Sequence, residues 1–196
     1  MKHPLKFNVR QLTLLDSGLF TEARELLCRT QGANIFKPGY LEKCSIEKDI
    51  LLLGAFSEAK LIGIAVARVL GPERTSVYAQ FGEKVLNTLQ TKRTGMLETA
   101  SVLECFQGHG VGRKLTQERM VWLESQGCVS VAGISWVSGL AHTSERVYLK
   151  LGFECIAEST EFYPAISLKF DFSCPVCGPP PCKCLAKFYL KRLDAQ

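Results

Sequence analysis

The segment at residues 107–112 reads Gln-Gly-His-Gly-Val-Gly and joins a strand-like run of residues to a helix-like run. Its glycines let the main chain approach a ligand closely, and the first amides of a helix have no acceptor within that helix. Such N–H groups, together with the positive end of the helix dipole, attract a pyrophosphate. The main-chain atoms expected to bind it belong to Gln107, Gly108, His109, Gly110, Val111, Gly112 and Arg113.

The flanking sequence predicts the elements that position this turn. Apolar and polar residues alternate over 97–104, which is typical of a strand with one buried face, so we expect a strand over 97–106. Residues 111–125 place Leu115 and Leu123 on one side of a helix, and Gly127 favours its end. The glycine spacing matches neither a Walker loop nor a Rossmann turn.

Two motifs resemble those of one known superfamily. Gln107, Gly110 and Gly112 are similar to the Gln/Arg-x-x-Gly-x-Gly/Ala signature of the GNAT superfamily, the acetyl-CoA-dependent N-acetyltransferases. Residues 146–153 resemble its second signature, which ends in aliphatic-Tyr-x-Lys-x-Gly-Phe. The resemblance covers residues 5–170 and is strongest over 97–153. It implies an α/β GNAT fold, in which helices flank a mixed, mostly antiparallel, splayed sheet.

The resemblance also implies a cosubstrate and its placement. Acetyl-CoA would lie in the splay, with its pyrophosphate on the glycine turn and its pantetheine along the main chain from Ala100 to Val102. Amides of that strand can stabilise the oxyanion that develops during acyl transfer. The implied reaction is direct transfer of the acetyl group to a primary amine.

Acetyl transfer to an amine requires a group that accepts a proton, because a lysine-type amine is mostly protonated at neutral pH. Glu98 lies four residues before Val102 and, at a strand period of two, is expected on the same face. Many relatives carry an acid at that place. A solvated carboxylate or an ion-pair partner is the other interpretation of Glu98, and Glu104 is the second candidate.

The departing CoA thiolate requires a proton donor, and the resemblance puts Tyr148 in that role. A tyrosine on an amphipathic helix is otherwise a core residue with a wetted hydroxyl. The chain departs from many relatives at Ala141 and Ser144, where they carry Asn and Ala. His142 is an alternative base or a histidine at the start of a surface helix.

Four cysteines gather near the C-terminal end of the sequence. They occur as Cys-Pro-x-Cys-Gly and Cys-x-Cys, and two thiolates three residues apart on a tight turn can reach one tetrahedral ion. A structural zinc site, free or oxidised thiols, and an iron–sulfur cluster are the alternatives. The candidate ligands are Cys174, Cys177, Cys182 and Cys184.

Patterning elsewhere predicts the remaining elements. We expect helices over 20–29 and 144–151, a helix or a mobile loop over 83–94, and an ambiguous element over 39–46. Alternation over 165–172 and 185–193 predicts a final hairpin whose loop, residues 174–184, carries the cysteines. The other expected strands span 6–12, 50–56, 60–70 and 129–136.

Composition limits the organisation and the partners. A chain of 196 residues with 46% hydrophobic residues suffices for one domain over 1–196, with the GNAT core at about 5–170. A net charge of +5 with Lys and Arg scattered among acids argues against nucleic acid as a partner. The longest apolar stretch, residues 50–56, is too short to span a bilayer. Nine cysteines, an odd number, fit reduced thiols and a cytoplasmic location.

These features together predict an acetyl-CoA-dependent N-acetyltransferase that acts on a primary amine of a small molecule or a protein, with a homodimer as one expected assembly. The alternative is a module that binds CoA without turnover and docks a protein or nucleic acid through its cysteine loop.

Overall fold

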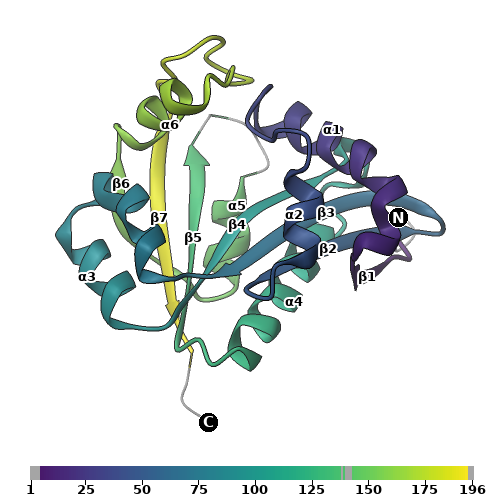
Figure 1. The fold of residues 1–196 in the computed structure, drawn as a ribbon, viewed down its shortest axis with the longest axis horizontal. Helices are drawn as coiled ribbons and strands as arrows, with labels where there is room; N and C mark the ends of the chain where they lie inside the picture. Colours follow the sequence, from purple (N-terminus) through teal and green to yellow (C-terminus); the bar gives the residue numbers. More distant parts are fainter. Residues whose placement is uncertain (1–4, 138, 140–142, 194–196) are drawn as a thin grey trace.

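The computed structural model describes residues 5–137, 139 and 143–193. Its centre is a seven-stranded sheet with the order β1-β2-β3-β4-β5-β7-β6, as Figure 1 shows. Every pair of neighbouring strands is antiparallel except β4 and β5. The strands are β1 (Asn8–Gln11), β2 (Ile50–Ser57), β3 (Lys60–Val69), β4 (Thr94–Val102), β5 (Ser130–Val137), β6 (Glu154–Ser159) and β7 (Leu185–Arg192).

Helices cover both faces of this sheet, so the predicted fold class is confirmed. Along β2, Leu51 and Leu53 pack with α4 (Val111–Ser125), whereas Leu52 packs with α1 (Phe20–Gln31). This alternation shows that both faces are buried, which explains the nearly continuous apolar sequence of β2 and β3. The other helices are α2 (Tyr40–Ile46), α3 (Glu83–Thr91), α5 (Ser144–Lys150), α6 (Phe162–Phe170), and the 3-10 helices η1 (Leu14–Leu19), η2 (Pro72–Phe81) and η3 (Glu104–Phe106).

The prediction of a strand over 165–172 was wrong, because these residues belong largely to helix α6. The hydroxyl of Ser159 accepts hydrogen bonds from the amides of Glu161 and Phe162, which stabilises the start of the helix. Pro164 lies in the first turn, where a missing N–H costs nothing. The strand that pairs with β7 on its outer side is β6.

Strand β4 changes its pairing at Glu98. On the β5 side, hydrogen-bonded pairing extends only from Thr94↔Ser130 to Leu97↔Gly133, beyond which the two strands separate. On the β3 side, Thr99 pairs with Val66 and Leu97 pairs with Ala67, so that Glu98 is an extra residue. Glu98 therefore forms a β-bulge at the point where the sheet splays.

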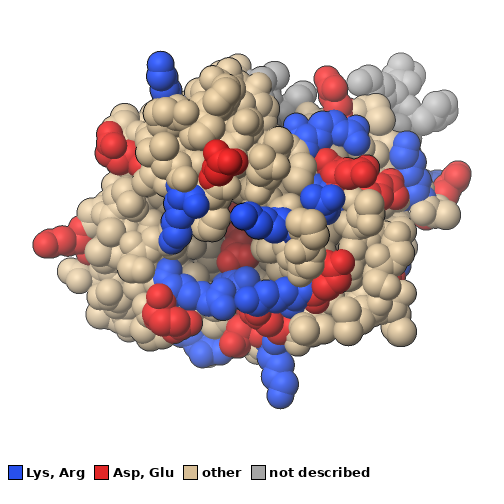
Figure 2. Space-filling model, turned by 45° about the horizontal axis from the view of Figure 1, so that its top comes forward, with Lys and Arg blue, Asp and Glu red and all other residues tan. Residues whose placement is uncertain are grey.

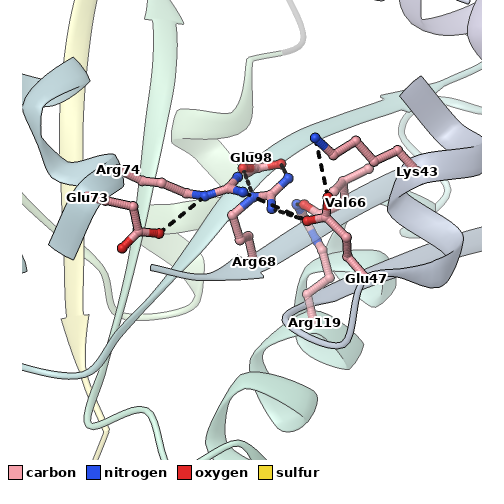
Figure 3. Close-up of polar contacts among 8 residues, drawn as sticks. All are labelled: Lys43, Glu47, Val66, Arg68, Glu73, Arg74, Glu98 and Arg119. Carbon is pink, nitrogen blue, oxygen red and sulfur yellow. Dashed lines mark hydrogen bonds and ion pairs between the residues drawn. The ribbon is translucent and has the colours of Figure 1, made fainter. Parts of the chain in front are cut away.

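Arg119 of α4 reaches the sheet at this bulge (Figure 3). Its Nη1 atom donates to the carbonyl oxygens of Val66 and Thr99, each at 3.1 Å. Its other nitrogens donate to the Leu115 carbonyl at 3.3 Å and to Thr116 Oγ1 at 3.1 Å. The side chain is buried, and desolvation lowers the pKa of Arg119 to about 10. The guanidinium thus donates hydrogen bonds to one carbonyl of β3 and one carbonyl of β4 beside the bulge.

We expect Arg119→Met to lower the free energy of unfolding by about 2 to 4 kcal/mol, because it removes a donor that two buried carbonyl oxygens share. Urea denaturation followed by circular dichroism measures this difference. Arg113→Met, at an exposed position of the same helix, is the matched control and should change stability by less than about 0.5 kcal/mol. Equal stability of the two variants would show that the bulge does not need the guanidinium.

Candidate functional site

The glycine turn leads from β4 through η3 into α4. Gly108 and Gly110 have φ angles of 78° and 87°, the left-handed region that favours glycine, and Gly110 is the N-cap of α4. Side chains hold the turn in place, since Gln107 Nε2 donates to the Val102 carbonyl at 3.0 Å and His109 Nδ1 lies 2.9 Å from the Gln107 carbonyl. The His109 ring therefore contacts the turn itself.

The main-chain amides of this turn are free. Within the described part of the chain, the amides of residues 108–113 donate to no acceptor, and the first helical bond runs from Lys114 N to the Gly110 carbonyl at 2.9 Å. Free donors at a helix start can bind an anion. The sequence prediction also included the amide of Gln107, but this amide donates to the Glu104 carbonyl at 3.1 Å, so the free amides begin at Gly108. The side chain of Gln107 supports the turn.

The edge of β4 beyond the splay has no strand partner. In the described residues, pairing with β5 ends at Leu97, and the carbonyls of Ala100 and Val102 accept hydrogen bonds from the side chains of Gln31 and Gln107 instead. The hydroxyl of Thr99 is buried and has no hydrogen-bond partner there. Ala100 is exposed although it belongs to the central strand. This edge can accept an extended, amide-containing ligand.

Tyr148 of α5 lies where β4 and β5 separate. A Cβ atom placed on Gly133 would stand 2.6 Å from the Tyr148 hydroxyl oxygen, so this glycine is required for the ring to lie where it does. The ring packs on Phe153 and Tyr189, with centroids 5.2 and 5.4 Å away. Burial raises the pKa of Tyr148, which keeps its phenol protonated.

Helix α5 is held against β5 and β7 by polar contacts. The Glu145 amide donates to Ser135 Oγ at 3.1 Å, and the Glu145 carboxylate accepts from Tyr189 Oη at 2.5 Å and from Lys187 Nζ at 3.2 Å. The hydrogen bond from Tyr189, followed by that from Lys187, lowers the pKa of Glu145. These contacts fix the helix that carries Tyr148.

The expectation that Glu98 and Val102 share a face of the sheet was wrong. Val102 packs in the cluster that contains Leu115 of α4, whereas Glu98 pairs with Arg68 on the face covered by α2. The bulge at Glu98 adds one residue and reverses the alternation of side chains beyond it. Glu104 does not belong to β4 at all, because it is an exposed residue that begins η3.

Glu98 belongs to a group of ion pairs (Figure 3). Arg68 Nε donates to Glu98 Oε1 at 2.5 Å, and Arg68 Nη1 donates to Glu47 Oε2 at 3.0 Å. Burial by itself would lower the pKa of Arg68, but the two carboxylates outweigh burial and raise it. The fixed guanidinium orients the Glu98 carboxylate and leaves its remaining lone pairs for other donors.

The face at the open end of the splay is hollowed (Figure 2). An acidic side chain is visible in the depth of the hollow, and Lys and Arg side chains line its rim. The acidic group at the base can interact with an amine, whereas the basic rim favours an anionic ligand. Residues Ala141 and His142, which the sequence raises as departures from relatives or as an alternative base, lie outside the described residues.

The four C-terminal cysteines converge. The Sγ atoms of Cys174, Cys177, Cys182 and Cys184 all lie within 4.8 Å of one another, and all four are free thiols. Three of these residues are buried and Cys177 is partly buried. The prediction that they form one group is confirmed, and their donor set fits a tetrahedral thiolate site.

Five residues that the sequence did not single out contact or position the predicted site residues: Arg68, Arg119, Gly133, Ser135 and Glu145. A charge inside the apolar run of β3 and a glycine inside β5 are sequence signals of buried ion pairing and of close approach.

The Acetyltransferase (GNAT) family model matches residues 20–153. This match covers more than half of the chain, so the chain belongs to the GNAT acetyltransferase family. A search of curated proteins finds no match.

Solved structures show the same fold. A ribosomal-protein alanine N-acetyltransferase from Escherichia coli is 14% identical, with a TM-score of 0.63 over 97% of this chain and 96% of that chain. An IAA acetyltransferase from Bacillus cereus is 15% identical, with a TM-score of 0.62 over 96% and 100%. A chain of the NatC complex bound to Gag peptide and CoA is 13% identical, with a TM-score of 0.64 over 96% and 99%. At these identities the likeness shows the GNAT fold.

None of the described helices has both the length and the apolar character needed to cross a bilayer.

We expect Gly110→Ala to weaken CoA binding, because a side chain at a φ of 87° strains the turn by about 1 kcal/mol or more and tilts its free amides. Isothermal titration with CoA measures the dissociation constant. Gly82→Ala is the matched control. Gly82 also has a φ of 88° and open surroundings, but it precedes α3 and does not belong to the glycine turn. Both variants should lose similar stability, and only Gly110→Ala should lose affinity. Equal affinities would argue against this turn as the phosphate site.

Proposed function

We propose that this protein is an N-acetyltransferase that moves the acetyl group of acetyl-CoA directly to a primary amine. The observation that carries the proposal is the arrangement about the splay. Tyr148 lies on the α4 side of the sheet and Glu98 on the α2 side, on either side of the point where β4 and β5 separate. A proton donor, Tyr148, and a proton acceptor, Glu98, would thus lie on opposite sides of the gap between β4 and β5.

The cosubstrate would bind on the α4 side. Its pyrophosphate would accept hydrogen bonds from the free amides of residues 108–113, and its pantetheine amides would bond to the β4 edge along Ala100 and Val102. The thioester would then reach the bulge, where main-chain amides can stabilise the oxyanion.

The amine would enter through the hollow on the other side. Glu98 would accept the proton that the amine loses, directly or through water, as the nitrogen attacks the thioester carbonyl. A tetrahedral intermediate forms, its C–S bond breaks, and the sulfur leaves as a thiolate that takes a proton from the Tyr148 hydroxyl. The products are an amide and CoA, and no covalent enzyme intermediate is needed.

The acceptor is proposed only as a class, a primary amine of a small molecule or of a protein. The rival function is a CoA-binding module without turnover, which docks a partner through its cysteine loop. A thiol-release screen of amine panels with acetyl-CoA separates the two.

We further propose a single domain over residues 1–196, acting in a reducing, cytoplasmic compartment, with a homodimer as its assembly.

We expect Tyr148→Phe to lower turnover by about 10- to 1,000-fold, because the departing thiolate loses its proton donor. The dissociation constant of CoA should hardly change, since the phosphate turn is untouched. Steady-state kinetics with thiol detection and calorimetric CoA binding measure the two quantities. Since the pKa of Tyr148 is raised above its ordinary value of 10.0, its deprotonation should not reduce wild-type turnover up to about pH 10.

Two further variants separate the loss of the hydroxyl from the loss of packing. Tyr189→Phe removes a neighbouring buried hydroxyl, which bonds to Glu145, and should lower the melting temperature more than turnover. Gly133→Ala keeps the Tyr148 hydroxyl but displaces it, and should lower turnover as Tyr148→Phe does. Full activity of Tyr148→Phe would remove this residue from the acid role.

We expect Glu98→Gln to lower kcat/KM at neutral pH by about 10- to 100-fold, because the amine loses its proton acceptor. The loss should shrink as pH rises toward the pKa of the amine substrate, where the free base is abundant. Glu73→Gln is the control, since Glu73 belongs to the same group of charges but pairs only with Arg74 in the described residues. A pH-independent deficit in Glu98→Gln would indicate that Glu98 only orders Arg68.

A further inference from the structure

The spacing of the four cysteine sulfurs matches one tetrahedral metal ion. Separations are 3.4 Å for Cys177 and Cys184, 3.9 Å for Cys174 and Cys184, and 3.9 Å for Cys177 and Cys182. Four sulfurs at about 2.3 Å from a zinc ion are about 3.8 Å apart. These separations are far too long for disulfide bonds.

Main-chain donors surround the sulfurs. The amides of Val176 and Cys177 lie 3.4 and 3.3 Å from the Cys174 sulfur, and the amide of Lys183 lies 3.4 Å from the Cys177 sulfur. Such donors offset the negative charge of a tetrathiolate site and orient its ligands. The segment around the cysteines contributes few apolar side chains of its own, so a bound metal ion would stabilise its structure.

One end of the cysteine segment is attached to α1 and, through α1, to β4. Ser173 pairs with Ala33, and Phe172 packs so closely on Gly32 that a Cβ there would meet the ring at 2.9 Å. Just before these residues, Gln31 Nε2 donates to the Ala100 carbonyl at 3.1 Å. The segment is therefore tied to the part of β4 that has left β5.

The other end of the cysteine segment is attached to β5. Cys184 directly precedes β7, whose first residues Leu185 and Ala186 pair with Val137 and Trp136 at the end of β5. Trp136 also packs against the cysteine cluster. In Figure 1 the loop after α6 passes above the end of β5 toward the end of α1.

We propose that Cys174, Cys177, Cys182 and Cys184 hold a structural zinc ion that staples the open side of the splay, linking the free end of β4 to the free end of β5. Each thiol gives up its proton on binding, and zinc undergoes no redox change. The staple would fix the separation of the strands that carry Glu98 and Gly133. Its effect on catalysis rests on the proposed acetyl transfer, whereas its effect on the fold does not.

The first test is metal content. Protein purified without added metal should contain about one zinc per chain by elemental analysis, and Cys177→Ser should contain far less. Cys155→Ser, which changes an exposed cysteine on β6, is the matched control and should keep its zinc. Absence of zinc, or iron in its place with visible absorbance, would overturn the zinc assignment.

The second test asks whether the zinc ion links β4 to β5. It uses the wild-type protein, so that misfolding of a variant cannot affect the result. Zinc is released with an organomercurial and a chelator, and hydrogen–deuterium exchange is followed by mass spectrometry. Exchange should quicken at residues 30–36 and 134–137, stay unchanged in the hairpin of β2 and β3, and recover when thiol and zinc are restored. Unchanged exchange at 30–36 would refute the link to β4.

A third measurement tests the consequence for catalysis once an amine substrate is known. Zinc release should lower turnover by about 10-fold or more, because small displacements of reacting groups are costly, while the CoA dissociation constant stays within about threefold. If no amine is acetylated, the metal content and the exchange data still decide the staple. If exchange is unchanged while acetylation proceeds, only the staple fails.

Discussion

The hydrogen bonds from Arg119 to the carbonyls of Val66 and Thr99 are the interaction on which the rest of the structure depends. A bulge in a central strand disrupts the ladder, and here the two carbonyls belong to the buried residues Val66 and Thr99, where water has little access. Arg119 supplies the donor from outside the sheet, at the cost of burying its own charge. Because the bulge is satisfied in this way, β4 can turn away from β5 and leave an unpaired edge inside the molecule.

The bulge also sorts side chains between the two sides of the sheet. Without it, Glu98 would lie on the face of Val102, under α4, with the phosphate turn. With it, Glu98 lies on the α2 face, beside Arg68, and Tyr148 lies on the other. In the proposed direct transfer, this separation would let one group take the proton of the amine while the other gives a proton to the thiolate that leaves the tetrahedral intermediate. One inserted residue therefore accounts for the placement of Glu98 on the face opposite Tyr148.

The parts of the fold that the sequence predicts are those set by local chemistry. The helix over 111–125 and the glycine turn before it were confirmed, because apolar spacing and left-handed glycines are local properties. The face of Glu98 was predicted wrongly, because register depends on partner strands. The helix over 162–170 was missed, because Ser159, which caps it, lies outside the alternating segment. Arg119 was open to prediction, since it stands four residues from both Leu115 and Leu123 on the buried stripe.

Where two strands of a sheet splay apart, no main-chain hydrogen bonds fix the distance between them. Beyond Leu97 and Gly133 no ladder bonds connect β4 and β5 in the described residues, so their separation must be set by other elements. On the α4 side, Ser135 binds the start of α5 and Gly133 receives Tyr148. On the α2 side, the cysteine segment lies between the end of α1 and the end of β5. The proposed zinc ion suits that position better than apolar packing would, because four thiolates on one ion set a distance while leaving the space between the strands open for a substrate.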